Sequence, residues 1–563
     1  MSNGSLLMIR ALSENPFIAE AELAGVLGEP LDDVGKALTD LRKAGIAGRV
    51  SHSAAPLPTS WRCFLTREGI KESSGALGFG TVSEFVRAYP MSREWLRLLI
   101  GRMDAVSSVY RLAATLSPGR DGLRTGVEFH RKGNFDATIT LHDGRAFGVV
   151  RQGLALPRRS LNERLTKIHE NHFSIRPDTI LILTPSPWER DMALEYWEGR
   201  KLEDGYVAAE SVESLAREDL SVWRRISSLI GGECTLAEVS AAARPGPWRS
   251  AGSPARKRAT IPDPVQMTRE APTFGMTSRQ KLALDIVANH SMIPRGQLRQ
   301  WLNVSDGRVS QVMSGLIDAW DLVERHGKRP NFRYALSGGG ISYIAHRDRT
   351  TLETARGAWS ADPQTDPDRR GPYEGSRNNA WSDLPGHADG ITWILSKLAG
   401  EANSDESIEH LLWTPEWRST RKYHHRERTF TPDAVVELTM EGRPMPFFIE
   451  YERRARHPAG VRQRLYPYQR YYGSPLTDGD LPPFPYTLFV VDSEAVAATY
   501  VTTAAAMGLR LPILVSSRPA LAEMGCLGRS WHLLWERASP RAKLSELSGY
   551  TWSSFHRRME RRN

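Results

Sequence analysis

The sequence is poor in cysteine. Its 563 residues include three cysteines, Cys63, Cys234 and Cys526, which lie far apart along the chain. Neither a disulfide framework nor a cysteine-rich zinc site can be built without neighbouring pairs. We therefore expect a protein of a reducing, cytosolic compartment.

Long apolar runs are missing as well. The N-terminus offers only the short run 6–9, followed by Arg10 and Glu14, which is neither a signal-peptide core nor a membrane span. No other stretch approaches the roughly 18 apolar residues of a spanning helix. We expect a soluble, cytoplasmic protein without membrane insertion.

Two common catalytic motifs are also absent. The sequence has no Gly-x-x-x-x-Gly-Lys-Ser/Thr loop, which argues against nucleotide hydrolysis. It has no Gly-x-Ser-x-Gly elbow either, which argues against the serine chemistry of α/β-hydrolases.

Basic residues, in contrast, are in excess. The chain has 74 Lys+Arg against 65 Asp+Glu, a formal net charge of +9, and 40% of its residues are hydrophobic. The apolar fraction is typical of folded proteins, and the length predicts about three to five domains. The positive charge makes nucleic acid a plausible partner.

The chain repeats itself. Residues 7–44 match residues 282–319 without a gap, and the apolar positions coincide through three consecutive stretches of helical spacing. A polar, hairpin-like stretch follows each copy, at 46–65 and 322–336. Three helices and a hairpin predict a winged helix-turn-helix in each copy, produced by an internal duplication.

In a winged helix the third helix enters the major groove and the wing lies along phosphates. The second copy suits this task, and the residues expected to contact DNA are Arg308, Ser310 and Gln311 on its helix and Arg325, Lys328, Arg329 and Arg333 on its wing. The third helix of the first copy opens with Asp32 and Asp33, which have the wrong sign for phosphates. Each module could alternatively be a dimerisation or protein-docking domain.

The duplication extends beyond the winged helices. Four β-like runs of the first half match four of the second, namely 134–141 with 431–438, 147–152 with 447–452, 179–184 with 486–491, and 205–207 with 512–514. An α/β domain is therefore expected after each winged helix. The expected boundaries are winged helix 1 at 1–75, α/β domain 1 at 80–235, a basic Pro/Ala-rich linker at 241–274 without regular elements, winged helix 2 at 278–348, a second linker at 351–389, α/β domain 2 at 390–545, and a basic tail at 546–563.

Three carboxylates stand out in the second α/β domain. Asp433 lies on one strand of a predicted hairpin, and Glu450 and Glu452 occupy alternate positions of the next, so all three can point to one face. Converging carboxylates suit Mg²⁺ or Mn²⁺, and a metal held there could activate water on a phosphodiester. Arg453 and Arg454 follow and are expected to contact DNA. Alternatively, carboxylates and arginines form surface ion pairs of little energetic weight.

This pattern resembles the PD-(D/E)xK nuclease superfamily, in which a metal-binding Asp is followed by a Glu, a spacer and a Lys on the next strand. The resemblance implies that the α/β domains are restriction-endonuclease-like. Together with the repeat, the expected fold class is α/β and α+β multidomain, a tandem duplication of winged helix-turn-helix plus restriction-endonuclease-like α/β domain. It also implies Asp433, Glu450 and Glu452 as catalytic residues, with Asp433 and Glu450 holding Mg²⁺ or Mn²⁺ if the site is catalytic, and no cofactor otherwise. Glu452 departs from the usual Lys, as in some restriction enzymes.

The winged helix, the strands that carry Asp433 and Glu450, and a helix with Arg464 and Tyr468 together resemble the replication-relaxation family of bacterial plasmids and other mobile elements. The resemblance covers most of residues 278–535 and, more faintly, 5–225. It implies a DNA-associated protein of the bacterial cytoplasm that binds double-stranded DNA, with a relaxase or other mobile-element protein as a further partner.

The first copy keeps Asp136 but has Val150 and Gln152 where the acidic pair should stand. We expect this domain to be a catalytically dead platform. In the second copy, the tyrosines of the stretch 465–472 could attack a phosphodiester, pack a helix on a sheet, or stack on unpaired bases.

Two functions remain open. One is a non-catalytic DNA-binding protein of plasmid or mobile-element replication, relaxation or transfer. The other is a metal-dependent endonuclease or nickase that acts at the second α/β domain.

Overall fold

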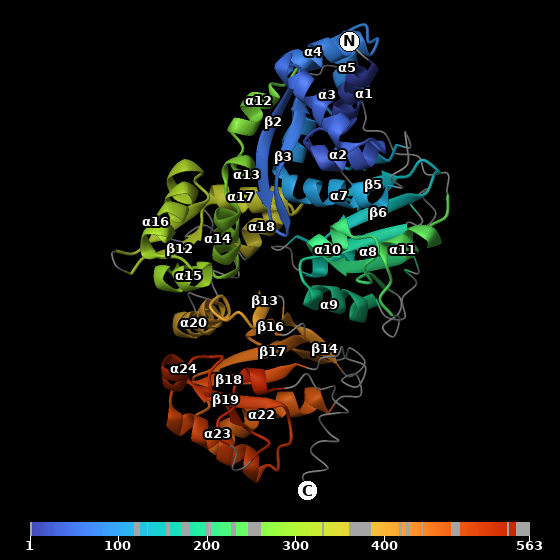
Figure 1. Cartoon of the computed structure of the whole chain (residues 1–563). Helices are drawn as coiled ribbons and strands as arrows, with labels where there is room; N and C mark the ends of the chain where they lie inside the picture. Colours follow the sequence, from blue (N-terminus) through green and yellow to red (C-terminus); the bar gives the residue numbers. More distant parts are fainter. Residues whose placement is uncertain are drawn as a thin grey trace. The chain divides into compact units, whose positions relative to one another are not determined.

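The structure is a computed structural model of the whole chain. It describes residues 3–117, 124–131, 133–153, 158–170, 177, 179–197, 202, 204–226, 232–245, 260–328, 331–359, 384–415, 419–423, 428–440, 443–473, 485–536 and 540–547. The chain folds into two compact units, the first formed by residues 1–281 and 342–355 and the second by residues 282–341 and 356–563. The fold is a mixed α/β arrangement with several sheets (Figure 1).

The first unit begins with a segment that we call the first three-helix module, residues 3–76. It is named for its first three helices, α1 (Asn3–Glu14), α2 (Glu20–Leu27) and α3 (Leu31–Lys43). Its other elements are β1 (Ile18–Ala19), β2 (Ala47–Ala54), β3 (Leu57–Leu65) and a closing helix, α4 (Arg67–Ala76). The strands form an antiparallel sheet of order β1-β3-β2. Gly28, at φ 65°, ends α2, because glycine adopts this left-handed conformation without strain.

Three helices follow the module: α5 (Val82–Ala88), α6 (Arg93–Gly101) and α7 (Met103–Leu116). Helix α7 is buried along most of its length and packs against α2. A Cβ atom on Gly25 would lie 2.9 Å from the Cβ of Ala114, so the close approach of these two helices requires glycine.

The first sheet domain, residues 126–226, contains a six-stranded sheet of order β4-β5-β6-β7-β8-β9. The strands are β4 (Gly126–Phe129), β5 (Ala137–Thr140), β6 (Ala146–Arg151), β7 (Thr179–Thr184), β8 (Gly205–Ala209) and β9 (Arg224–Arg225), and the helices are α8 (Arg158–Glu170), α9 (Pro187–Trp197) and α10 (Val212–Ala216). Strands β6, β7 and β8 run parallel, and the other pairs are antiparallel. The strands predicted in this half are confirmed.

Regular elements also occur in the segment 241–274, after α11 (Leu236–Ala242). Helices α12 (Pro264–Arg269) and α13 (Pro272–Gly275) each begin with proline, whose fixed φ suits the first turn of a helix. The ring of Phe274 packs 5.7 Å from that of Phe17. The expectation of a linker without regular elements is therefore wrong for residues 264–269 and 272–274, while residues 246–259 lie outside the described residues.

The second three-helix module, residues 278–347, repeats the order of elements of the first. It contains α14 (Ser278–Asn289), β10 (Ile293–Pro294), α15 (Arg295–Leu302), α16 (Asp306–Ser314), the π-helical turn η1 (Gly315–Ala319), β11 (Val323–His326), β12 (Arg333–Leu336) and α17 (Gly338–Arg347). Its sheet has the order β10-β12-β11, as in the first module. Ser305 caps α16, since its hydroxyl accepts the N–H of Arg308.

The expected second linker, 351–389, also contains helix. Helix α18 (Leu352–Ala358) lies within it, and α20 (Pro385–Ala402) begins before its predicted end. The linker expectation is wrong for these residues, and residues 360–383 lie outside the described part of the chain.

The second sheet domain, residues 385–547, has a six-stranded sheet of order β13-β16-β17-β18-β19-β20 (Figure 1, orange to red). Its strands are β13 (Ile408–Pro415), β16 (Ala434–Met440), β17 (Arg443–Glu452), β18 (Tyr486–Val491), β19 (Ile513–Ser517) and β20 (His532–Leu533), and its helices after α20 are α22 (Pro458–Tyr472), α23 (Glu494–Ala506), α24 (Arg518–Met524) and the short 3₁₀ turn η3 (Leu544–Glu546). The central strands β17, β18 and β19 are parallel and the outer pairs antiparallel, as in the first sheet domain. A separate hairpin, β14 (Arg421–Tyr423) with β15 (Arg428–Phe430), has no counterpart among the described residues of the first sheet domain.

Within the part of the chain that the structure describes, no helix combines the length and apolarity needed to cross a bilayer.

Candidate functional site

Strand β17 presents alternate side chains to two different helices. Tyr451 faces α20, where a Cβ atom on Gly390 would come within 1.8 Å of its ring, so only glycine allows this packing. Glu450 and Glu452 point the other way, toward Arg464 of α22. The strand thus places its two predicted carboxylates on one face.

Asp433 lies just before β16 and joins them at the end of β17. Its Oδ2 accepts the backbone N–H of Tyr451 at 2.8 Å, and its Oδ1 lies 3.2 Å from Nε2 of His387 on α20. The imidazole of His387 stacks on the Tyr451 ring with a centroid distance of 6.0 Å. The three predicted acidic residues therefore line one region, at the carboxyl end of a parallel strand, where α/β folds commonly bind ligands.

Glu450 is the most deeply enclosed of the three. Its Oε2 accepts a hydrogen bond of 3.0 Å from Arg464, and its Oε1 accepts one from the hydroxyl of Tyr468. Burial and the neighbouring Asp433 carboxylate hold the pKa of Glu450 well above its usual range, although Arg464 opposes them.

Glu452 shares the same guanidinium. Its Oε2 lies 2.6 Å from Nε of Arg464, and its Oε1 accepts the backbone N–H of Ala455 at 3.1 Å. Arg464 consequently bridges Glu450 and Glu452, and protein donors already engage both carboxylates.

The sequence reasoning missed the roles of two residues, Arg464 and His387. Arg464 was noted only as part of a family resemblance, although its position between the buried Val461, Leu465 and Tyr468 places it on the inner side of α22. His387 lies far upstream on α20, and no local pattern connects it with Asp433.

A pocket of about 490 Å³ opens beside these carboxylates. Its lining residues come from the start of α20, the segment before β16, the end of β17 and the turn after it, and α22: Leu384, His387, Thr431, Asp433, Tyr451, Glu452, Arg453, Arg454, Arg456 and Arg464. Arg453, Arg454 and Arg456 are exposed at its rim, the last of them 3.4 Å from Asp492. A basic rim of this kind suits an anionic ligand such as a phosphate.

The donor set does not fit a divalent metal in this arrangement. Among the described residues, no group of three or more His, Cys, Asp or Glu side chains is placed to hold a metal ion. The reason lies in the geometry, because Arg464 stands between Glu450 and Glu452, where a cation would be bound.

The predicted DNA-contacting residues of α16 share an exposed face. Arg308, Ser310 and Gln311 are exposed, and the guanidinium of Arg308 donates to Oε1 of Gln311 at 2.8 Å. On the wing, Arg325 lies over the Phe332 ring at 4.6 Å and Lys328 is exposed. Arg329 lies outside the described residues.

Arg333 has a different environment from the other predicted wing residues. Its guanidinium donates two hydrogen bonds of 2.7 Å to the carboxylate of Asp389 on α20. Arg62 is the equivalent residue of the first module, because Arg62 pairs with Ala19 in the sheet as Arg333 pairs with Pro294. Arg62 likewise forms an ion pair, which is buried, with Glu22. Arg333 thus holds the second three-helix module against α20.

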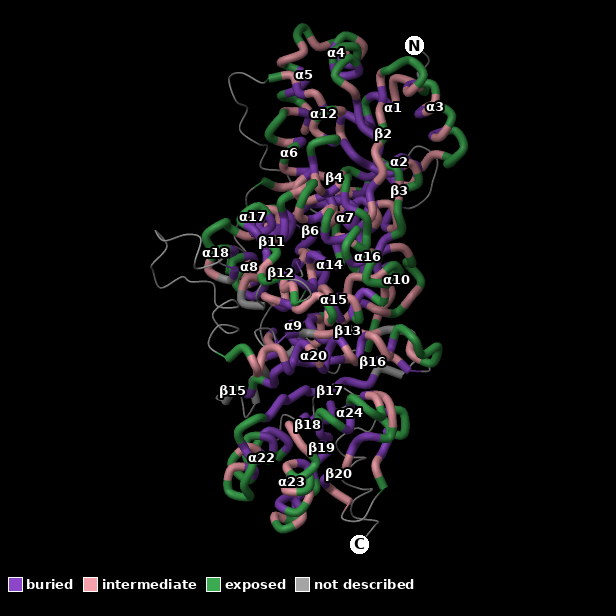
Figure 2. The backbone as a smooth tube through the Cα atoms, turned by 90° about the vertical axis from the view of Figure 1, so that its left-hand side faces the viewer, coloured by how far each residue is buried: buried purple, intermediate pink, exposed green. Residues whose placement is uncertain are grey.

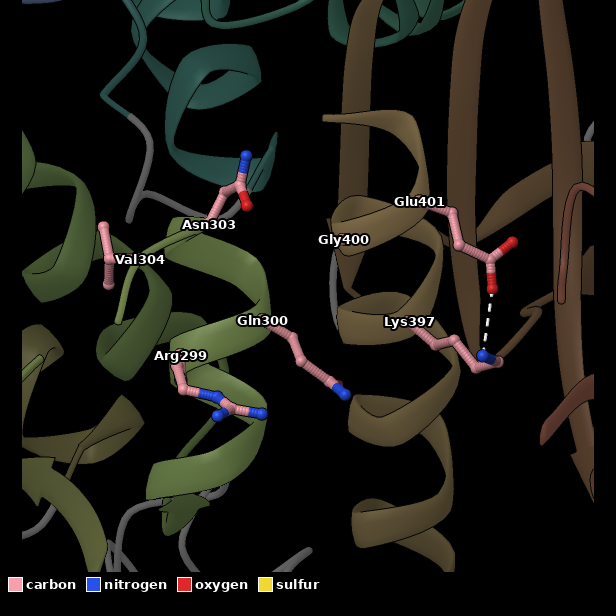
Figure 3. Close-up of a pocket in the computed structure, with 7 residues that line it drawn as sticks. All are labelled: Arg299, Gln300, Asn303, Val304, Lys397, Gly400 and Glu401. Carbon is pink, nitrogen blue, oxygen red and sulfur yellow. Dashed lines mark ion pairs between the residues drawn. The ribbon is translucent and has the colours of Figure 1, made fainter. Parts of the chain in front are cut away.

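A second pocket, of about 320 Å³, lies between α15 and α20 (Figure 3). Arg299 and Gln300 line it from α15, Asn303 and Val304 from the turn after α15, and Lys397, Gly400 and Glu401 from α20. Figure 3 shows Gln300 pointing toward α20, where it accepts a hydrogen bond of 3.2 Å from Ser396, and Lys397 paired with Glu401 at 3.1 Å. These contacts make the pocket part of the packing between the two helices.

The first sheet domain surrounds its aspartate with arginines. Oδ2 of Asp136 accepts the N–H of Arg151 and a guanidinium N–H of Arg164, both at 2.7 Å, and Oδ1 accepts from Arg349 at 2.9 Å. Burial alone would raise the pKa of Asp136, but Arg164 and Arg349 together bring it far below its usual range. Val150 stands in the strand position that Glu450 occupies in the second sheet domain.

Comparison with protein families matches residues 284–479 to the replication-relaxation family. The matched segment runs from α14 past the end of α22 and so includes the basic face of α16 and the carboxylate pocket. No curated protein and no solved structure matches the chain. The family match indicates a role in the replication or DNA relaxation of plasmids or mobile elements.

Proposed function

We propose that the chain is a DNA-binding protein of plasmid or mobile-element replication or relaxation, and that its second half contacts duplex DNA. The observation that carries this proposal is the exposed face of α16, where Arg308, Ser310 and Gln311 lie within the segment matched to the family. Such side chains can reach base edges and phosphates from the major groove.

We further propose that both three-helix modules are winged helices and that the two halves arose by duplication. The repeated sheet order of the modules supports this proposal, as does the shared succession of antiparallel and parallel pairs in the two six-stranded sheets. In the first module Asp32 and Asp33 are exposed at the start of α3, which disfavours contact with phosphates. The second module is therefore proposed as the principal DNA reader.

Duplex binding tests this proposal. Substituting Arg308, Arg325 and Lys328 by Ala should weaken duplex affinity and make the slope of log K against log salt shallower by about 0.9 for each phosphate that the variant no longer neutralises. Affinity and slope are measured by fluorescence anisotropy with the full chain.

Arg333→Ala provides a matched control, because its guanidinium is engaged by Asp389 and should contribute nothing to the salt slope. If the triple variant retains wild-type affinity, the second module is a protein-docking domain and the proposal fails.

The alternative function is a metal-dependent endonuclease or nickase at Asp433, Glu450 and Glu452. The gathering of three carboxylates beside a basic rim favours it, but Arg464 engages two of them. We expect supercoiled plasmid to stay intact with Mg²⁺ or Mn²⁺. Nicking that disappears in the double variant Asp433→Ala plus Glu450→Ala would instead establish the enzyme.

A further inference from the structure

The outward side of α22 carries a regular stripe of three side chains. Arg462, Tyr466 and Arg470 are exposed and recur every four residues, so they lie on one side of the helix, about 6 Å apart along its axis. Tyr466 is 55% exposed, and the guanidinium carbon of Arg470 lies 5.6 Å from its ring centroid. Figure 2 shows the alternation of exposed and buried residues along this helix.

Packing explains the other tyrosines of this helix. Tyr468, Tyr471 and Tyr472 are buried in the second sheet domain, where Tyr468 packs 4.7 Å from the Phe430 ring and Tyr472 bonds Thr487. The hydroxyl of Tyr468 donates to Glu450, and burial, together with this carboxylate, raises the pKa of Tyr468 well above its usual range. Tyr466 is the member of the group that faces solvent.

The charged residues of α22 and of the turn before it are of one sign. Residues 453–472 contain six arginines and no Asp or Glu. Arg453, Arg454 and Arg456 rim the carboxylate pocket, and Arg464 enters it. Arg462 and Arg470 extend this positive charge along the outer side of α22, on either side of an aromatic ring.

We propose that Arg462, Tyr466 and Arg470 bind single-stranded nucleic acid, with a base stacked on Tyr466 and phosphates beside the two arginines. In a duplex the base faces are covered by their neighbours, whereas an unpaired base offers a free face to an aromatic ring. The guanidinium groups supply charge-assisted hydrogen bonds to phosphate oxygens. This inference rests on the proposed nucleic-acid function and adds an unpaired strand beside the carboxylate pocket.

Anisotropy measurements with the full chain test the stripe, using a short labelled single strand and the matching duplex. Tyr466→Ala should weaken single-strand binding by roughly fivefold or more and leave duplex affinity unchanged, whereas Tyr466→Phe, which keeps the ring, should bind as the wild type does. Arg462→Gln with Arg470→Gln should make the single-strand salt slope shallower by about 0.7 for each phosphate that the variant no longer neutralises.

Thr502→Ala, on the exposed side of α23, is the matched surface control and should change nothing. Wild-type affinity of Tyr466→Ala for the single strand would overturn the inference. The inference would also be overturned if poly-glutamate displaced the labelled strand as readily as unlabelled single strand does, because this result would indicate an acidic protein partner.

The two proposals can fail separately. A wild-type protein that binds duplex through α16 but binds no single strand would refute the stripe alone. A protein that binds single strands through Tyr466 but binds no duplex would refute the proposed function of α16 alone.

Discussion

Asp136 and Asp433 make the same backbone contact in opposite electrostatic surroundings. Each accepts, through Oδ2, the N–H of a residue on the neighbouring strand, Arg151 at 2.7 Å and Tyr451 at 2.8 Å. Beside Asp136 stand two guanidinium groups, whereas Asp433 has the carboxylates of Glu450 and Glu452 nearby and the imidazole of His387 at 3.2 Å.

The contribution of each aspartate to the fold can therefore be distinguished from a contribution to ligand binding. Because the hydrogen bond to the neighbouring strand is shared, the aspartate by itself is explained by the joining of two strands. The features that differ, Glu450, Glu452 and the exposed arginines after them, are the ones that point to a ligand.

The wings of the two modules also differ. The first wing strand begins at Ala47 in the first module and at Val323 in the second. Counted from these two residues, His52 and Lys328 occupy the same position. Lys328 is exposed, whereas His52 is buried against Phe274, with its Nε2 at 3.0 Å from Asp104. The first wing serves the packing of its own unit, and the second carries an exposed cation.

The largest expected effect is at Asp136. Replacing it by Ala leaves Arg164 and Arg349 buried without their shared carboxylate, which should cost about 3–5 kcal/mol of the stability of the first unit. Asp433→Ala should cost the second unit far less, about 1 kcal/mol, because removal of the hydrogen bond is offset by relief of repulsion with Glu450.

Hydrogen exchange resolved by peptide measures each unit separately, as a chain of several domains does not unfold in one step. If Asp136→Ala and Asp433→Ala decreased the protection of their units equally, the two aspartates would contribute equally to stability, which would contradict the comparison.

The sequence predicted the strands around both aspartates because their apolar runs and turn residues are local signals. Strand alternation also sufficed to bring Asp433, Glu450 and Glu452 together. It could not predict the engagement of the two glutamates by Arg464, which depends on how α22 packs on the sheet. The pairing of Arg333 with Asp389 could not be predicted either, because it joins the second three-helix module to α20 of the second sheet domain.

The remaining prediction concerns pH and the first wing. Burial is the main cause that lowers the pKa of His52 to about 4, and the nearby Lys281 adds to it, against the opposing hydrogen bond with Asp104. Ser107 also contacts the ring, at 3.2 Å from Nδ1, while Asp104 itself has a lowered pKa and stays ionised. Between pH 6.5 and about 4 the unfolded chain therefore binds a proton that the folded first unit does not.

Stability contributed by His52 should accordingly be complete above pH 6.5 and fall as the pH falls, by about 2 kcal/mol between pH 6.5 and pH 5. His52→Gln, which cannot titrate, should be less stable at neutral pH but should show no such dependence, as measured by hydrogen exchange of the first unit. If the stability of wild type and of His52→Gln fell in parallel, burial of the histidine would not govern the pH dependence, and the contrast between the two wings would fail.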